Sequence, residues 1–207
     1  MADGRSKLPR VLTTGRCERI TRALEAAYDQ CRTRFDRNVG FDNQTFGQMV
    51  FKSCWFHLDQ YLAGDPGVRV LRDYNSFELD VDGTVLHPYK LGQRDGEIYE
   101  RYPSNEEAFA FMAGENIEQI TLFPAKPPRR LVLAHAGNPI DGLRAVYLAA
   151  PVMDGDGDFG WAWVVRIDDL GGEAGVERPQ PVDIPPPELG SVDTRPERRR
   201  AERGEDA

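Results

Sequence analysis

The sequence predicts an α+β fold in which N-terminal helices pack on a mainly antiparallel sheet, followed by a disordered C-terminal tail. Up to about residue 62 the apolar residues recur every three or four positions, as on one face of a helix. From residue 68 onward the period changes to two, which is typical of strands. The strands follow one another in hairpins without regular strand–helix alternation, and this order favours α+β over a parallel α/β fold.

Composition divides the chain into three parts. We expect residues 1–14 to form a flexible arm and residues 15–170 to form a single α+β domain. Residues 171–207 contain six prolines, nine acidic residues and six arginines, with almost no aliphatic clusters. Such a segment cannot bury enough apolar surface to offset the entropy lost on ordering, so the sequence predicts that this tail is disordered.

The first helix is predicted over residues 16–35. Its apolar residues recur at helical spacing and would form one buried stripe: Ile20, Leu24, Ala27, Cys31 and Phe35. Gly40 and the Asn and Asp residues around it predict a break before the next helix.

The second helix is predicted to open at Thr45, because Thr45 and Gln48 have the spacing of a capping box. Gly64 is a suitable C-terminal stop. The adjacent Trp55 and Phe56 make this helix apolar on more than one side. We therefore expect it to be the central helix of the fold.

The first three strands are predicted at residues 68–72, 77–82 and 84–89. Asp82 and Gly83 separate the second from the third, as expected of a two-residue hairpin turn. Pro88 has no backbone N–H, so it is expected only on an edge strand. Residues 104–114 then read as a short helix opened by a second capping box.

The last three strands are predicted as a meander that starts at residues 131–135 and continues through 142–150 and 159–167. In the final strand Phe159, Trp161, Trp163, Val165 and Ile167 alternate, which predicts that all five lie on one face. Residues 154–158 form an acidic, glycine-containing turn between the last two strands. Both faces of this hairpin are apolar, so it could also supply a homodimer surface.

Charge and composition exclude several classes of function. The net charge of −8 argues against a protein that holds nucleic acid by its phosphates. No apolar run approaches the ~20 residues of a membrane span, and the first residues contain no apolar signal core, so we expect a cytoplasmic protein without a membrane partner. The three cysteines lack metal-type spacing and are expected to be reduced and packed as small hydrophobic residues.

One hairpin collects side chains that could be catalytic. Glu78, Asp80, His87 and Lys90 surround it, and such groups could form a metal-dependent hydrolase or nuclease site. The acid-x-lysine triplet of restriction-type nucleases is missing, because Pro88 stands two residues before Lys90. The alternation also fits a simple polar face, so the sequence favours no catalytic residue, no metal and no cofactor.

The remaining histidines are candidates without an accompanying motif. His57 lies three residues after Cys54 and would share a helix face with it, as in a metal or Cys–His pair. His135 is predicted at a strand end, where loops often carry function. We favour a structural role for His57, because no third ligand stands at a characteristic spacing.

We interpret the chain as a non-enzymatic cytosolic protein-interaction module: an inhibitor, an antitoxin-like partner or an accessory subunit of a bacterial system. The absent catalytic motifs, the acidic charge and the aromatic residues support this interpretation. The predicted binding residues are Trp55, Tyr147, Trp161, Trp163, Arg129 and Arg130. A small-ligand-sensing domain remains an alternative, and a cavity lined by Trp55, Trp161 and Tyr147 would favour it.

Overall fold

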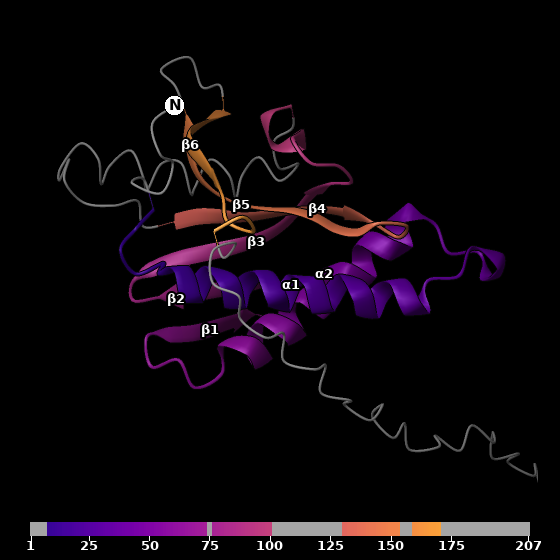
Figure 1. Cartoon of the computed structure of the whole chain (residues 1–207), viewed down its shortest axis with the longest axis horizontal. Helices are drawn as coiled ribbons and strands as arrows, with labels where there is room; N and C mark the ends of the chain where they lie inside the picture. The colour runs from indigo at the N-terminus through magenta and orange to yellow at the C-terminus, as the bar shows by residue number, and fades with distance from the viewer. Residues whose placement is uncertain (1–7, 74–75, 101–129, 154–158, 171–207) are drawn as a thin grey trace, which may run out of the picture. The chain divides into compact units, whose positions relative to one another are not determined.

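Two helices cover one face of a six-stranded sheet in the computed structural model, which describes residues 8–73, 76–100, 130–153 and 159–170 (Figure 1). The sheet is antiparallel except for one pair of strands. The predicted α+β class is confirmed. The predictions of a helix at 104–114, a turn at 154–158 and a disordered tail at 171–207 lie outside the described residues.

The first helix, α1 (Thr14–Arg34), is capped by the Thr13 hydroxyl, which accepts a hydrogen bond from the Arg16 N–H at 3.3 Å. Its buried face contains the predicted apolar stripe up to Cys31. Leu12, within the stretch expected to be a flexible arm, is only 4% exposed and packs in the core. A 3₁₀ turn, η2 (Arg37–Val39), ends at Gly40, whose φ of 89° requires the left-handed region.

The second helix, α2 (Asn43–Leu62), is capped by Asp42, three residues before the cap predicted at Thr45. The carboxylate of Asp42 accepts hydrogen bonds from both the N–H and the hydroxyl of Thr45, at 2.8 and 2.9 Å. The Asp42 side chain thus pairs with a backbone N–H of the first turn, so Thr45 lies inside the helix rather than at its cap. Gly64 follows the C-terminus with a φ of 79°, as predicted for the stop.

The strands lie in the sheet in their order along the chain, β1-β2-β3-β4-β5-β6. Only β3 and β4 run parallel, and residues 93–129 separate them. The bounds of the strands are β1 (Val68–Asp73), β2 (Ser76–Val81), β3 (Thr84–Gly92), β4 (Arg130–Asn138), β5 (Gly142–Met153) and β6 (Phe159–Arg166). The short 3₁₀ helix η3 (Glu97–Tyr99) follows β3.

The turn between β2 and β3 is the predicted two-residue turn. Asp82 and Gly83 both have positive φ, at 48° and 87°, as in a type I′ hairpin. Pro88, in contrast, does not lie on an edge strand, because β3 is flanked by β2 and β4. The β2–β3 ladder ends at Leu86, so at Pro88 only β4 still pairs with the strand, and a missing N–H is tolerated there.

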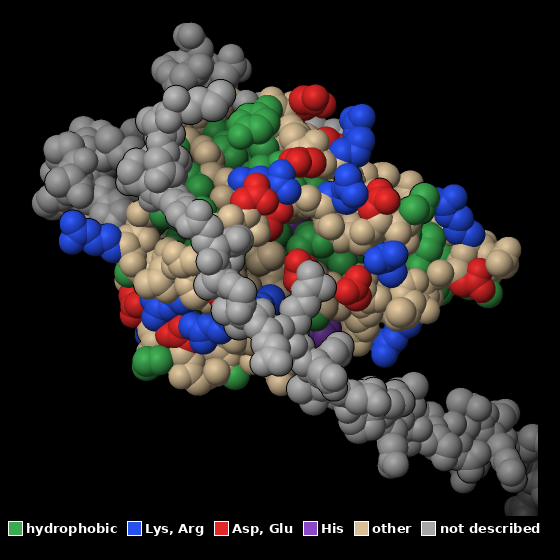
Figure 2. Space-filling model, in the orientation of Figure 1, with side chains coloured by type: hydrophobic (Ala, Val, Ile, Leu, Met, Phe, Trp, Pro, Cys, Tyr) green, Lys and Arg blue, Asp and Glu red, His purple; other side chains and the backbone are tan. Residues whose placement is uncertain are grey.

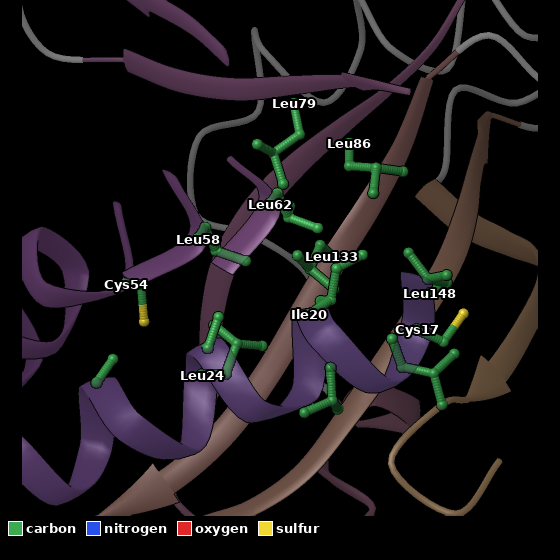
Figure 3. Close-up of a cluster of buried hydrophobic side chains, with 14 of the residues drawn as sticks. Cys17, Ile20, Leu24, Cys54, Leu58, Leu62, Leu79, Leu86, Leu133 and Leu148 are labelled. Carbon is green, nitrogen blue, oxygen red and sulfur yellow. The ribbon is translucent and has the colours of Figure 1, made fainter. Parts of the chain in front are cut away.

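The main core lies between the helices and the sheet. In Figure 3, leucines of β2 to β5 point toward apolar side chains of α1 and α2. These side chains are almost completely buried and include Ile20, Leu24, Leu58, Leu79, Leu86, Leu133 and Leu148. Burial of each such side chain contributes about 2 kcal/mol, which makes this layer the main source of stability.

A second, smaller apolar cluster covers the opposite face of the sheet. It contains Leu91, Ile98, Val132, Ala134, Ala145, Tyr147 and Ala149. Trp161 and Phe159 of β6 pack here, whereas Trp163, Val165 and Ile167 pack in the main core. The prediction that all five share one face is therefore wrong. A β-bulge adds Ala162 opposite the step from Ala150 to Pro151, and the extra residue reverses the alternation.

Arg16 connects three parts of the chain near the start of α1 by hydrogen bonds. Its guanidinium donates to Asp65, after α2, at 3.0 and 2.7 Å, and to Asp82, in the β2–β3 turn, at 2.7 Å. It also donates to the carbonyl of Val11. The hydrogen bond with Arg16 holds the pKa of the Asp65 carboxyl far below its usual range. Asp65, whose side chain is 5% exposed, also pairs with Arg19.

Candidate functional site

The structure brings two of the four candidate catalytic residues together. His87 Nδ1 lies 3.6 Å from Glu78 Oε1, and the Arg130 guanidinium donates to the same oxygen at 2.9 Å. The neighbouring His87 imidazole, followed by the positive charge of Arg130, lowers the pKa of Glu78. All three side chains lie on the sheet face opposite the helices, because their chain neighbours Leu79, Leu86 and Leu131 pack in the main core.

Asp80 and Lys90 do not join this cluster. Asp80 shares the face of Glu78, but its carboxylate accepts from Arg69 at 2.5 Å and from the Gly83 N–H at 2.7 Å. Lys90 pairs with His135 across β3 and β4, on the helix side of the sheet. Its ammonium donates to the Gly92 carbonyl at 3.0 Å, and burial lowers its pKa. The four residues thus occupy two faces and do not converge on one substrate position.

The described part of the chain shows no group of three or more His, Cys, Asp or Glu side chains arranged to hold a metal ion. An open cleft lies beside the start of α1, but none of the predicted site residues lines it. Among the described helices, none has the length and apolar character needed to cross a membrane.

Two of the predicted binding residues, Tyr147 and Trp161, fix the segment after β3 to the sheet. The Tyr147 hydroxyl donates to the carboxylate of Asp95 and accepts from the Gly96 N–H at 3.0 Å. Burial, followed by the hydrogen bond with Asp95, raises the pKa of Tyr147 to about 12. The Trp161 indole N–H donates to the Ile98 carbonyl at 2.9 Å. The polar atoms of both residues are therefore occupied within the chain.

The other predicted binding residues lie elsewhere. Trp163 packs in the main core, Arg130 pairs with Glu78, and Arg129 lies outside the described residues. Trp55 packs on the helix side of the sheet, whereas Trp161 and Tyr147 pack on the opposite side. These three aromatic residues therefore cannot line one cavity. The described residues thus lack the cavity that would favour a ligand-sensing domain.

Trp55 is the centre of an aromatic and basic surface on α2, which we call the Trp55 patch: Phe51, Lys52, Trp55 and the neighbouring Arg72. The Trp55 ring stacks on the buried Phe77 at a centroid distance of 5.6 Å and an interplanar angle of 15°. The Phe51 ring packs edge-on to the Trp55 ring at a centroid distance of 4.5 Å, and the Lys52 ammonium lies 3.9 Å from the Trp55 centroid. The Trp55 side chain is thus held in place from two sides.

The composition of α2 differs from that of α1. Only Lys52 and Asp59 are charged among its 20 residues, whereas α1 has eight charged residues among 21. Phe51, Phe56 and Tyr61 of α2 are each at least 36% exposed. A surface poor in charge and rich in aromatic side chains is typical of protein–protein interfaces.

The charge near Trp55 is opposite in sign to that of the whole chain. Lys52 and Arg72 carry two positive charges, and Asp59, paired with Arg72 at 2.6 Å, carries one negative charge. The patch together with the adjacent Asp59 therefore has a net charge of +1, on a chain whose net charge is −8. On the face drawn in Figure 2, basic and acidic side chains are interspersed rather than gathered by sign.

A buried polar chain that the sequence did not predict connects the helices to β4. The hydroxyl of Tyr28, on α1, and His135 Nδ1 are hydrogen-bonded at 3.0 Å, and His135 Nε2 lies 4.0 Å from Cys54 Sγ, on α2. His57, the candidate partner of Cys54 by spacing, bonds instead to Gln30 at 3.1 Å. Tyr28 and His135 are 107 positions apart, so no spacing rule links them.

A thiol, an imidazole and a phenol in contact have the residue types of a nucleophile, a base and an orienting group. Burial raises the pKa of the Cys54 thiol and lowers the pKa of His135 to about 3. Both groups are therefore neutral near pH 7, and a buried protonated thiol is a poor nucleophile. The geometry fits a structural network that satisfies polar groups inside the core.

Gly137 makes room for this network. A Cβ atom at this position would lie 2.4 Å from Tyr28 Cε1 and 2.3 Å from the carbonyl oxygen of Gly142. The Tyr28 ring can therefore lie against β4 only because residue 137 has no side chain.

The buried His135 should make the fold sensitive to acid. A histidine in the unfolded chain binds a proton near pH 6.5, whereas the buried imidazole stays neutral down to about pH 3. Its contribution to stability is therefore complete above pH 6.5 and is lost as the pH falls below that value. We expect the free energy of unfolding to fall by about 2 kcal/mol between pH 7.5 and pH 5.

Urea denaturation at the two pH values measures this change. Burial also lowers the pKa of His57, which acts in the same direction, so the variant His135→Gln isolates the share of His135. The loss of stability on acidification should be about 2 kcal/mol smaller in this variant. An equal loss in both proteins would show that His135 does not cause the acid sensitivity.

No protein-family model, no curated protein and no solved structure matches this chain. Its own residues are therefore the only basis for assigning it a function.

Proposed function

We propose that this chain is a non-enzymatic protein-interaction module and that the Trp55 patch is its contact surface. The observation that carries the proposal is the pairing of a fixed, partly exposed Trp55 ring with a charge-poor helix surface. Tryptophan in such a setting is the residue type most enriched at interface hot spots. Because Phe77 already holds the ring, binding a partner would cost little side-chain entropy.

The partner that fits this surface is an apolar protein segment carrying a carboxylate. Lys52 and Arg72 lie at the aromatic rings, and acidic side chains on the partner would complement their positive charge. Such a chain could act as an inhibitor, an antitoxin-like partner or an accessory subunit. We place it in the cytoplasm, since its three cysteines are free thiols, as in reducing compartments.

A second copy of the chain is the alternative partner. β6 lies at one edge of the sheet, with Trp161 and Trp163 on its two sides, and an edge strand can pair with another chain. Light scattering of the purified chain distinguishes this alternative, because a dimer would have twice the mass of 23.3 kDa.

Paired surface variants test the proposed contact surface. Lys52→Glu and Phe51→Ala change the Trp55 patch, and we expect each to reduce recovery of the partner about tenfold. Arg144→Glu makes the same charge change on the exposed bulge of β5, and Tyr99→Ala removes a ring that is 68% exposed on η3, away from α2. These two matched variants should keep the partner.

The measurement is size-exclusion chromatography with light scattering and mass spectrometry of the tagged full chain, recovered from its organism of origin. Wild type should elute as a stoichiometric complex. A lone monomer at native concentration would contradict the interaction module. Equal recovery with all four variants would place the contact surface elsewhere on the molecule.

A further inference from the structure

We propose that an extended, acidic segment of a partner protein adds to the sheet as a further strand beside β1, and places an apolar side chain on the Trp55 patch. β1 forms one edge of the six-stranded sheet (Figure 1). This inference rests on the proposed role of the patch as the contact surface, and adds how the partner is held there.

The outer side of β1 presents backbone groups to which another strand can bind. The Asp82 N–H donates to the Gly67 carbonyl at 2.8 Å, and this pair continues the register of β1 with β2. Hydrogen-bonded pairs alternate along an antiparallel ladder, so Val70 and Arg72 direct their backbone N–H and C=O groups away from β2. Within the described residues, these outward groups have no hydrogen-bond partner.

β1 is better suited to accept a strand than β6, the opposite edge of the sheet. The ladder of β1 with β2 has no register shift, whereas β6 contains the bulged residue Ala162. A bulge twists an edge and hinders pairing with another strand. The outward N–H of Val68 is already used, since it donates to the Asp65 carbonyl at 3.0 Å. A new strand would therefore pair with β1 beyond Val68.

A strand in this position would run beside the Trp55 patch. Arg72 lies opposite Phe77 in the ladder, and the Trp55 ring stacks on Phe77. Asp59 lies two helical turns after Lys52 on the same face of α2, and pairs with Arg72 at 2.6 Å. α2 thus follows this edge of the sheet. Because side chains alternate along a strand, every second residue of the added strand would face α2 and the aromatic rings of the patch.

The charges along β1 favour an acidic partner. The side chains of Arg69 and Arg72 are 76% and 53% exposed, whereas Asp80, which pairs with Arg69, is only 11% exposed. Together with Lys52, the charges nearest to solvent at this edge are therefore mostly positive. A second copy of β1 would bring the same arginines to the contact and be repelled, whereas an acidic segment would be attracted.

Hydrogen exchange resolved to single amides tests the added strand in the full-length chain. In the free chain, the amides of Val70 and Arg72 should exchange rapidly, whereas those of Arg69 and Leu71, which face β2, should be protected. In the complex recovered from the organism of origin, Val70 and Arg72 should exchange about tenfold more slowly or less, because a new hydrogen bond must open first. Equally rapid exchange of both amides in the two states would overturn the proposal.

A backbone variant provides a second test. Val70→Pro removes the outward N–H but no hydrogen bond to β2, and proline is tolerated at such an edge position. We expect recovery of the partner to fall about tenfold, because a carbonyl of the partner loses its donor. Val164→Pro is the matched control on β6. The Ile167 N–H donates to the Val146 carbonyl at 2.9 Å, so alternation directs the Val164 N–H away from β5.

The control should keep the partner, and urea denaturation verifies that both proline variants are folded. Carbodiimide coupling of the recovered complex examines the chemistry of the partner, because this reagent joins an ammonium directly to a carboxylate. Lys52 should be linked to an aspartate or glutamate of the partner, and mass spectrometry identifies the segment. A linked segment without net negative charge would contradict the proposed chemistry.

The same variants separate this inference from the proposed function. If Lys52→Glu loses the partner but folded Val70→Pro keeps it, the Trp55 patch stands as the contact surface and the added strand fails. If Val70→Pro loses the partner while both patch variants keep it, the proposed contact surface fails, and with it the placement of a side chain on the Trp55 patch. A chain that is recovered alone overturns both.

Discussion

Replacing Gly137 with alanine should lower the free energy of unfolding by about 3 kcal/mol, at the upper end of the range for overpacked cores. The new Cβ would lie 2.3 Å from the Gly142 carbonyl oxygen, and a backbone atom cannot rotate away. It would also press on the Tyr28 ring at 2.4 Å and disturb the hydrogen bond with His135. For a domain of this size the melting temperature should fall by roughly 6–12 °C.

Gly47→Ala is the matched control for this substitution. Gly47 lies inside α2, and nothing stands within 4 Å of the position that its Cβ would take. Alanine is the better helix former, so this variant should gain about 0.8 kcal/mol. Thermal and urea denaturation of both variants measure the difference. If Gly137→Ala is as stable as wild type, the close packing of Tyr28 against β4 is wrong.

The second large effect is expected for the ion pair between Arg16 and Asp65. Asp65→Asn keeps the size of the side chain but leaves the guanidinium of Arg16 without its bidentate partner. Breaking a mostly buried ion pair by removing one charge costs about 3 kcal/mol. The end of α2 should loosen from the start of α1, whereas Arg16 keeps its hydrogen bonds to Val11 and to Asp82 of the β2–β3 turn. Hydrogen exchange locates this loosening, and urea denaturation measures its free energy.

Arg32→Met provides the control, because it breaks an ion pair on the same helix. Arg32 and Asp29 are 3.4 Å apart, with side chains 40% and 71% exposed. Exposed pairs of this kind contribute about 0.5 kcal/mol or less. Similar losses in the free energy of unfolding in Arg32→Met and Asp65→Asn would mean that the Arg16–Asp65 pair contributes no more to stability than an exposed pair.

The regular elements could be predicted from the sequence because their signals are local. The buried stripe of α1 follows from residues three and four positions apart, and the Asp82–Gly83 turn follows from two adjacent residues. The start of α2 was misplaced because two capping signals compete there. The Asp42 carboxylate accepts a hydrogen bond from the Thr45 N–H, so the helix begins before the capping box at Thr45.

Two predictions about which face of the sheet a side chain occupies were wrong, for different reasons. The faces of Trp161 and Trp163 depend on the single bulged residue Ala162, and strict alternation is lost at a bulge. Lys90 and His87 were grouped because they are close in sequence, yet their odd spacing places them on opposite faces. For these two residues, strand alternation by itself is sufficient to predict the separation.

The contacts of the buried network were beyond sequence reasoning for a different reason. His135 meets Tyr28 and Cys54 across separations of 107 and 81 positions. Each residue alone has an ordinary local context, so only the packing of α1 and α2 on β4 brings them together. The Trp55 patch was partly foreseen, since Trp55 was a predicted binding residue, but its cation Lys52 was not.

The parallel pairing of β3 with β4 has a consequence for the entropy of chain closure. Every other neighbouring pair of strands is connected by a short link, such as the two residues between β2 and β3. The parallel pair alone requires residues 93–129 to be closed into a loop. The entropic cost of loop closure rises with loop length. The largest closure cost within the sheet therefore belongs to the pairing of β3 with β4, the middle pair in the strand order.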